Sequence, residues 1–183
     1  MLVDDKYYTA AWYHDASECL KIIDQRYLPW KFIINDINNS NQIFTAIKDM
    51  LVRGAPLIGT VAAFGAYFAV NEAKSKKEYQ KIIDKLKSSR PTAVNLFHAL
   101  NYVNSFIDFN KSKKENIISS LSAAKKYRKI NNNDCKKIGN YGLDLVEKIS
   151  KKKKRKINIL THCNAGWLAC GDFGTATAPI YAA

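Results

Sequence analysis

Residues 55–70, APLIGTVAAFGAYFAV, form the longest apolar run of the chain. At 16 residues the run is shorter than the roughly 20 that a membrane-spanning helix needs. Its many small residues suit close packing between helices, and Pro56 suits a first helical turn, where its missing N–H is not needed. The run therefore predicts a helix packed tightly inside the core of a soluble domain.

The residues that precede this run predict a small sheet and one helix. Two segments rich in Ile and Phe, CLKIIDQ (19–25) and WKFIIND (30–36), flank RYLP, so we expect two strands joined by a turn that contains Pro29. After Asn and Ser, which favour helix starts, NQIFTAIKDML (41–51) carries apolar residues at helical spacing.

The residues that follow the run predict further helices. A lysine-rich helix comes first, and the segment 88–109 then predicts a helix that begins at Pro91. One face of that helix carries Val94, Phe97, Leu100 and Ile107. Two more helices are expected at 117–130 and 134–149. Residues 1–149 are thus predicted to form an α+β N-terminal domain, a small antiparallel sheet plus helices.

The sequence changes in character at SKKKKRK (150–156), which we interpret as a basic linker. INIL (157–160) is then a short continuous apolar segment that leads into a glycine-rich turn and a helix, the opening of a βα unit in a parallel sheet. A parallel strand needs a partner reached through a crossover, and no second strand is expected before Ala183. Residues 157–183 therefore predict only the start of a second, α/β domain.

The composition points to a folded protein with an anionic partner. The 183 residues are 47% hydrophobic and 11% aromatic, values typical of a globular protein. The formal charge of +13 favours anionic partners, among them phosphorylated metabolites. Most lysines stand in runs with Asn and Ser that are typical of solvated surfaces, and 150–156 lacks interleaved aromatic residues. We expect neither a nucleic-acid nor a membrane partner.

The four cysteines indicate a reducing compartment. Cys19, Cys135, Cys163 and Cys170 show no CxxC spacing, and the first ten residues, MLVDDKYYTA, do not resemble a signal peptide. We therefore expect reduced thiols and a cytoplasmic protein.

Two of the few arginines stand just before prolines that are expected to begin helices. Arg53 lies in RGAP (53–56) and Arg90 directly precedes Pro91. A helix N-terminus offers free N–H groups and partial positive charge, and a guanidinium adds paired donors, so each place suits a phosphate. The alternative is that each arginine packs over a helix start or pairs with a carboxylate.

Cys163 lies just past the expected strand end, where open α/β sheets place their ligands, and the glycines that follow let backbone come close to a ligand. A thiol there could act as a nucleophile or proton carrier. The alternatives are a buried structural cysteine and a metal ligand. His162, Cys163 and Cys170 lack the spacings of zinc sites, and no nucleotide-binding motif is present, so we expect neither a metal nor a cofactor.

Four segments together resemble the methylthioribose-1-phosphate isomerase family: IIDQRYLP, AIKDMLVRGAPLIG, SSRPTAVNLFHAL and ILTHCNAGWLACGDFGTATAPIYAA. The resemblance extends from about Lys21 to Ala183. RGAP alone would indicate only the wider superfamily, which includes ribose-1,5-bisphosphate isomerases and regulatory subunits of eukaryotic initiation factor 2B. HCNAGWLA together with RPTAVN favours the methylthioribose branch.

The resemblance implies a cofactor-free isomerisation of 5-methylthioribose 1-phosphate to 5-methylthioribulose 1-phosphate, a step of methionine salvage. It implies that Arg53, Gly54, Ala55 and Arg90 bind the phosphorylated sugar and that Cys163 assists at the reacting centre. It also implies a homodimer and makes residues 157–183 the first βα unit of a Rossmann-like domain.

The sequence departs from the family pattern in one large respect. Family members continue through a complete second domain with an Asp proton donor, a substrate-binding Gln and an Asn-Lys pair, and these have no counterpart here. Asp172 is a nearby carboxylate, but we do not assign it the missing role. We therefore expect the 183 residues to be inactive alone. The alternative is a non-catalytic relative that serves as a ligand-binding or assembly module.

Overall fold

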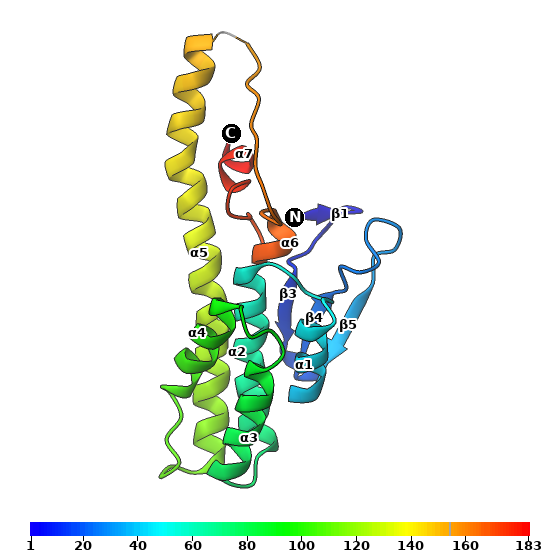
Figure 1. Cartoon of the computed structure of the whole chain (residues 1–183), viewed down its shortest axis with the longest axis vertical. Helices are drawn as coiled ribbons and strands as arrows, with labels where there is room; N and C mark the ends of the chain where they lie inside the picture. Colours follow the sequence, from blue (N-terminus) through cyan, green and yellow to red (C-terminus); the bar gives the residue numbers. More distant parts are fainter. Residues whose placement is uncertain (154) are drawn as a thin grey trace.

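The computed structural model describes residues 1–153 and 155–183 (Figure 1). Two small sheets come from the N-terminal part: β1 (Leu2–Val3) with β2 (Lys6–Tyr7), and β3 (Ala11–His14) with β4 (Cys19–Ile23) and β5 (Ile34–Ile37). The main helices are α1 (Ser40–Lys48), α2 (Ala55–Glu72), α3 (Lys76–Lys87), α4 (Val94–Asn104) and α5 (Lys113–Lys153). Two short helices follow, α6 (Trp167–Cys170) and α7 (Ala178–Ala182).

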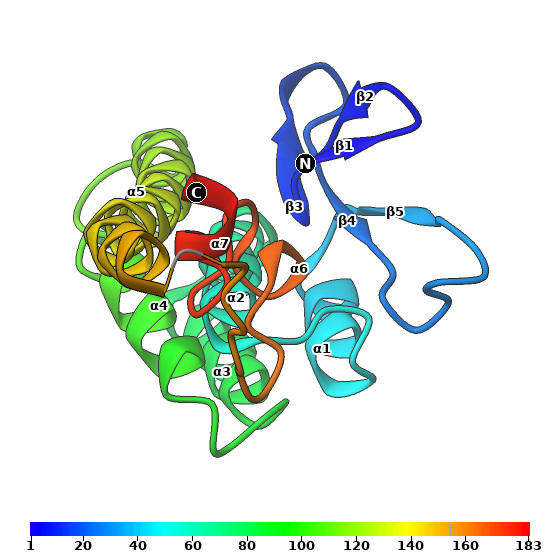
Figure 2. The ribbon, with the colours of Figure 1, turned by 90° about the horizontal axis from the view of Figure 1, so that it is seen from above.

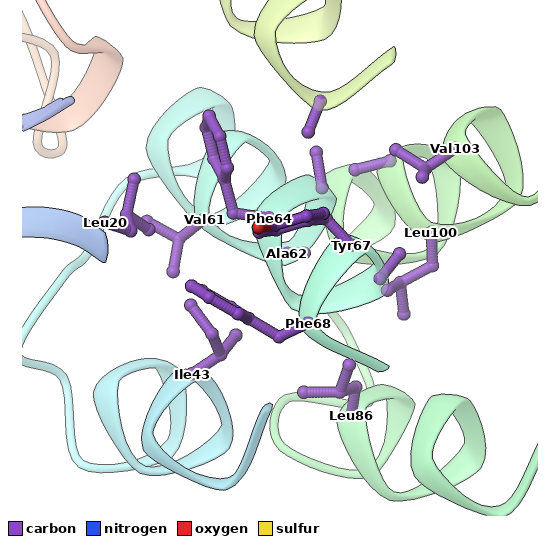
Figure 3. Close-up of a cluster of buried hydrophobic side chains, with 14 of the residues drawn as sticks. Leu20, Ile43, Val61, Ala62, Phe64, Tyr67, Phe68, Leu86, Leu100 and Val103 are labelled. Atoms are coloured by element: carbon purple, nitrogen blue, oxygen red, sulfur yellow. The ribbon is translucent and has the colours of Figure 1, made fainter. Parts of the chain in front are cut away.

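Helix α2 is the centre of the core, as the apolar run predicts. Every residue from Leu57 to Val70 is buried. Figure 3 shows why: α2 presents Val61, Phe64 and Phe68 to side chains that come from several elements. These partners are Leu20 of β4, Ile43 of α1, Leu86 of α3, and Leu100 and Val103 of α4. A helix surrounded in this way must be apolar on all sides.

The larger sheet confirms the two predicted strands and adds a third. β4 pairs antiparallel with β5, in a register that sets Leu20 opposite Ile37, and β3 pairs with the other edge of β4. β5 begins later than its predicted segment, because the chain turns between Tyr27 and Lys31, where the Lys31 N–H bonds to the Tyr27 carbonyl at 3.0 Å. Figure 2 shows the strands and α1 to one side of helices α2 to α5, and Figure 1 shows α6 just beyond the start of α2.

The expectation of two helices at 117–130 and 134–149 is wrong, because α5 is one helix of 41 residues. The run Asn131–Asn133 disfavours a helix interior, but Asn131 makes tertiary hydrogen bonds. The side-chain amide of Asn131 donates to Thr60 Oγ1 at 3.1 Å and to the Pro56 carbonyl at 3.4 Å. These bonds to α2 offset the weak helix propensity of the run.

The start of α4 also differs from its prediction. Pro91 lies in a turn in which the Ala93 N–H bonds to the Arg90 carbonyl at 3.0 Å, and the helix begins at Val94. Val94 is 76% exposed, and the buried face carries Leu96, Ala99, Leu100 and Val103. Of the residues expected on the buried face, Leu100 is fully buried and Phe97 and Ile107 are partly buried against the core.

The strand predicted at 157–160 is not formed among the described residues. The segment is extended but belongs to no sheet, and Leu160 is 98% exposed. A strand is stabilised by hydrogen bonds to a neighbouring strand, and among the described residues nothing pairs with this segment. Residues 150–153 of the expected linker belong to α5, and residue 154 lies outside the described residues. The domain limits 1–149, 150–156 and 157–183 stay predictions.

The described part of the chain contains no helix long and apolar enough to cross a membrane.

Candidate functional site

Cys163 lies in a turn that the backbone makes between the extended segment 157–162 and α6. Its φ is +71°, a left-handed conformation that non-glycine residues rarely adopt, and its thiol is exposed. The Ala165 carbonyl, just after the turn, accepts from the Thr175 N–H at 2.8 Å and from Thr177 Oγ1 at 3.0 Å, which ties this part of the chain to the segment after α6. The reading of Cys163 as a buried structural cysteine is therefore wrong.

The segment Arg53–Ala55 lies against this turn. The side-chain amide of Asn164 donates to the Arg53 carbonyl at 3.4 Å. Gly54 has φ +102°, and a Cβ at this position would lie 2.4 Å from the Ala169 Cβ. Only glycine allows this approach, so the start of α2 and helix α6 form one structural unit. Ala55 is the first residue of α2.

Arg90 lies near the start of a neighbouring helix. Arg90 is half-buried and precedes α4. The start of α4 packs against α2, because a Cβ on Gly59 in the second turn of α2 would lie 3.1 Å from the Asn95 carbonyl oxygen. Within the described residues, the guanidinium groups of Arg53 and Arg90 form no ion pair with a carboxylate, and Arg90 makes no hydrogen bond to the Cys163 turn. The Arg53–Ala55 segment thus lies against the Cys163 turn and α6, whereas Arg90 lies before α4 and does not contact the turn by a hydrogen bond.

Two residues that the sequence analysis did not select hold α6 in place. The Gln25 side-chain amide donates to the Leu168 carbonyl at 2.7 Å, and the Ala10 N–H donates to the Gly171 carbonyl at 2.9 Å. A one-turn helix leaves its last carbonyls without partners inside the helix, so both bonds satisfy groups that would otherwise be unpaired. Gln25 lies in IIDQRYLP, one of the four segments that carry the family resemblance, but nothing in that segment indicated its contact with α6.

Asp172 is engaged in a structural contact. Its carboxylate accepts a hydrogen bond from the Tyr7 hydroxyl and lies 3.4 Å from the Met1 amino group. Burial and the hydrogen bond to Asp172 raise the pKa of Tyr7 to about 12, so Tyr7 stays a neutral donor to the carboxylate at neutral pH. Asp172 thereby fastens the N-terminal hairpin to the segment after α6, which agrees with giving it no catalytic role.

The other cysteine of this region is buried beside a cysteine of α5. Cys170 and Cys135 are 1% and 3% exposed and belong to one apolar cluster with Ala169. The hydrogen bond with Cys135, together with burial, raises the pKa of the Cys170 thiol. Among residues 1–153 and 155–183, no three His, Cys, Asp or Glu side chains come together as metal ligands.

The arrangement suits an anion held next to a thiol. The N-terminus of an 18-residue helix, an exposed guanidinium and an exposed thiol lie on adjacent segments. The free N–H groups and positive end of α2 attract a phosphate, and Arg53 can supply charge-assisted hydrogen bonds.

Comparison with known protein families identifies one match. A model described as the Initiation factor 2 subunit family matches residues 51–183. That range contains the Arg53–Ala55 segment, Arg90 and the Cys163 turn.

Curated relatives are isomerases. The chain is 45% identical to the methylthioribose-1-phosphate isomerase of Desulfatibacillum aliphaticivorans, over 100% of this chain and 51% of that protein. It is 40% identical to the enzyme of the same name from Escherichia coli O45:K1, over 100% of this chain and 50% of that protein. The chain thus spans about half the length of the curated relatives it matches.

Two crystal structures share the fold. The 5-methylthioribose 1-phosphate isomerase from Pyrococcus horikoshii matches with a TM-score of 0.77 at 32% identity, over 94% of this chain and 48% of that one. Subunit delta of the translation initiation factor eIF-2B from A. fulgidus matches with a TM-score of 0.77 at 30% identity, over 96% of this chain and 51% of that one. The fold alone therefore does not separate an isomerase from an initiation factor subunit.

The contact between Gly54 and Ala169 generates a prediction. Replacing Gly54 with Ala should lower the free energy of unfolding by about 2–4 kcal/mol, because the new Cβ overlaps Ala169 and φ is positive. Gly166→Ala is the matched control, since its φ is −82° and no atom lies within 4 Å of a Cβ there. Urea denaturation measures both. Equal stability of the two variants would contradict the close approach of α2 and α6.

Proposed function

We propose that this chain, which belongs to the Initiation factor 2 subunit family, is part of an isomerase of methionine salvage that converts 5-methylthioribose 1-phosphate to 5-methylthioribulose 1-phosphate. The observation that carries the proposal is the packing of the Arg53–Ala55 segment against the Cys163 turn. Curated relatives that align with the whole of this chain are methylthioribose-1-phosphate isomerases, which supports the same conclusion.

The substrate phosphate binds at the start of α2 in this proposal. Arg53 is exposed and free of carboxylate partners within the described residues, so its guanidinium is available to a ligand. Charge-assisted hydrogen bonds contribute about 1.5–3 kcal/mol each, and a helix N-terminus adds about 0.3–1 kcal/mol. Arg90, near the start of α4, approaches the substrate from the neighbouring helix. The dianion is then held between two helix starts.

The reaction moves one hydrogen and opens one ring. The bond between C1 and the ring oxygen breaks, the hydrogen on C2 moves to C1, the C2 hydroxyl loses its proton to become a carbonyl, and the ring oxygen gains a proton. No oxidant or reductant is consumed, so the chemistry needs no redox cofactor. In our proposal the thiol of Cys163 faces the first two carbons and assists their proton transfer.

The phosphate on C1 prevents simple ring opening, so the site must assist that step while excluding water. The Asp proton donor that the family resemblance implies has no counterpart among these 183 residues, and Asp172 is engaged by Tyr7. We propose that residues outside this sequence, from the remaining length seen in the relatives, supply it. In this proposal the 183 residues alone do not convert the sugar phosphate.

We further propose that 157–160 becomes the first strand of a Rossmann-like domain. Ile159 and Leu160 are 46% and 98% exposed in an extended segment. Exposed apolar side chains in an extended, unpaired backbone suit a strand that is buried on both faces once neighbouring strands are present. A homodimer and a cytoplasmic location stay predictions.

Because eIF-2B subunit delta has the same fold, a non-catalytic role is the alternative to an isomerase. An experiment with the sugar phosphate distinguishes the two. An isomerase converts 5-methylthioribose 1-phosphate, which is followed by the appearance of the ketose. A binding module would bind the sugar phosphate without turnover in the complete protein, and an assembly module would not bind it.

Arg53→Ala should weaken binding of 5-methylthioribose 1-phosphate by at least about tenfold, because one charge-assisted contact is lost. Isothermal titration calorimetry on the complete protein measures the dissociation constant. Arg155→Ala is the control, since Arg155 is also exposed but lies outside the site. An unchanged affinity in the Arg53 variant would refute the phosphate contact.

Cys163→Ser should lower kcat by about 10²–10⁴ while the dissociation constant of the sugar phosphate changes less than about threefold, because the thiol assists proton transfer and does not hold the phosphate. Cys19→Ala, in β4, should leave kcat within about threefold of the unaltered protein. A Cys163 variant with normal kcat would exclude the thiol from the chemistry.

A further inference from the structure

Gln25, two residues after β4, makes contacts near both parts of the candidate site, the Arg53–Ala55 segment and the Cys163 turn. Its backbone N–H donates to the Leu51 carbonyl at 2.9 Å, two residues before Arg53. Its side-chain amide donates to the Leu168 carbonyl at 2.7 Å, in the helix that follows the Cys163 turn. One residue thus bonds to the segment before the expected phosphate site and to the segment after the expected reacting thiol.

The burial of Gln25 makes these bonds effective. The residue is only 6% exposed, so water cannot easily replace the amide as a donor to the Leu168 carbonyl. A carbonyl can only accept, which fixes the amide nitrogen toward α6. The amide oxygen has no hydrogen-bond partner among the described residues. Among the described residues, the buried Gln25 side chain therefore makes one hydrogen bond, to α6.

The surroundings of Gln25 hold its backbone firmly. Asp24, directly before it, is 0% exposed, and its carboxylate accepts from the Arg26 guanidinium at 2.7 Å and from Asn35 at 3.1 Å. Burial alone would raise the pKa of Asp24, but the hydrogen bonds from Arg26 and Asn35 outweigh it and lower the pKa. The carboxylate thus stays ionised and fastens the residues on both sides of Gln25 at neutral pH.

We propose that Gln25 is a positioning residue of the isomerase site: it sets the distance between the Arg53–Ala55 segment and the Cys163 turn by bonding to the chain on either side of them. The inference rests on the proposed function for its catalytic consequence, but the positioning itself is a property of the ligand-free protein. Gln25 does not touch the substrate. It acts through α6, whose Ala169 lies against Gly54.

The test replaces Gln25 with Met, which keeps the length of the side chain and removes the donor. Gln80→Met is the matched control, because Gln80 is exposed on α3 and its amide bonds only locally, to Asp84 at 2.9 Å. In the complete protein without ligand, amide hydrogen exchange over 162–171 should become at least about tenfold faster in the Gln25 variant. Exchange over α2 should not change, and the control should match the unaltered protein.

The kinetic readout separates positioning from general stability. In the Gln25 variant kcat should fall at least about tenfold. The dissociation constant of 5-methylthioribose 1-phosphate should change less than about threefold and the binding stoichiometry should not change, because the backbone bond of residue 25 to Leu51 still holds the segment before Arg53. If the Met variant is not recovered folded, Gln25→Glu, which also lacks the amide donor, takes its place.

Unchanged exchange over 162–171 would overturn the proposal, and so would faster exchange throughout α2, since Gln25 would then be a general stabiliser. Faster local exchange in a protein whose unaltered form does not isomerise the sugar phosphate would support the positioning and refute the proposed function. The two failures are therefore distinguishable.

Discussion

The contact between Gly54 and Ala169 is the constraint on which the candidate site depends. Residues more than a hundred positions apart in the sequence meet there, with no room for a side chain on Gly54. Because α6 rests directly on the start of α2, the turn with Cys163 is brought beside the Arg53 carbonyl. The close approach of α6 to α2 thus brings the segments that carry the N-terminus of α2, the Arg53 guanidinium and the Cys163 thiol next to one another.

The rest of the fold holds the two partners of that contact. Helix α2 is fixed because it is buried along nearly its whole length, with side chains of the sheet, α1, α3 and α4 packed around it (Figure 3). Helix α6 is too short to be stable alone and is held from the sheet side by Ala10 and Gln25. The sheet of β3, β4 and β5 therefore helps to position the site, although none of its residues is proposed to take part in the chemistry.

Elements whose signals were local could be predicted from the sequence. The apolar run predicted α2, Pro56 its first turn, and the two Ile-rich segments β4 and β5. The continuity of α5 could not be predicted, because Asn131 is stabilised in the helix by bonds to Thr60 and Pro56, which are distant in sequence. The strand expected at 157–160 failed for the opposite reason: its residue types suit a strand, but strand formation requires a partner. Arg53 and Cys163 could be selected from motifs, whereas the side-chain contact of Gln25 with Leu168 spans 143 residues and has no local signal.

A crystal structure of the complete Cys163→Ser protein with bound 5-methylthioribose 1-phosphate would show whether the substrate lies between the start of α2 and residue 163. We expect the phosphate within hydrogen-bond reach of the Arg53 guanidinium and the first N–H groups of α2, with C1 and C2 about 3–3.5 Å from the residue 163 side chain. A phosphate bound away from the start of α2, or a sugar whose first two carbons face away from residue 163, would contradict this expectation.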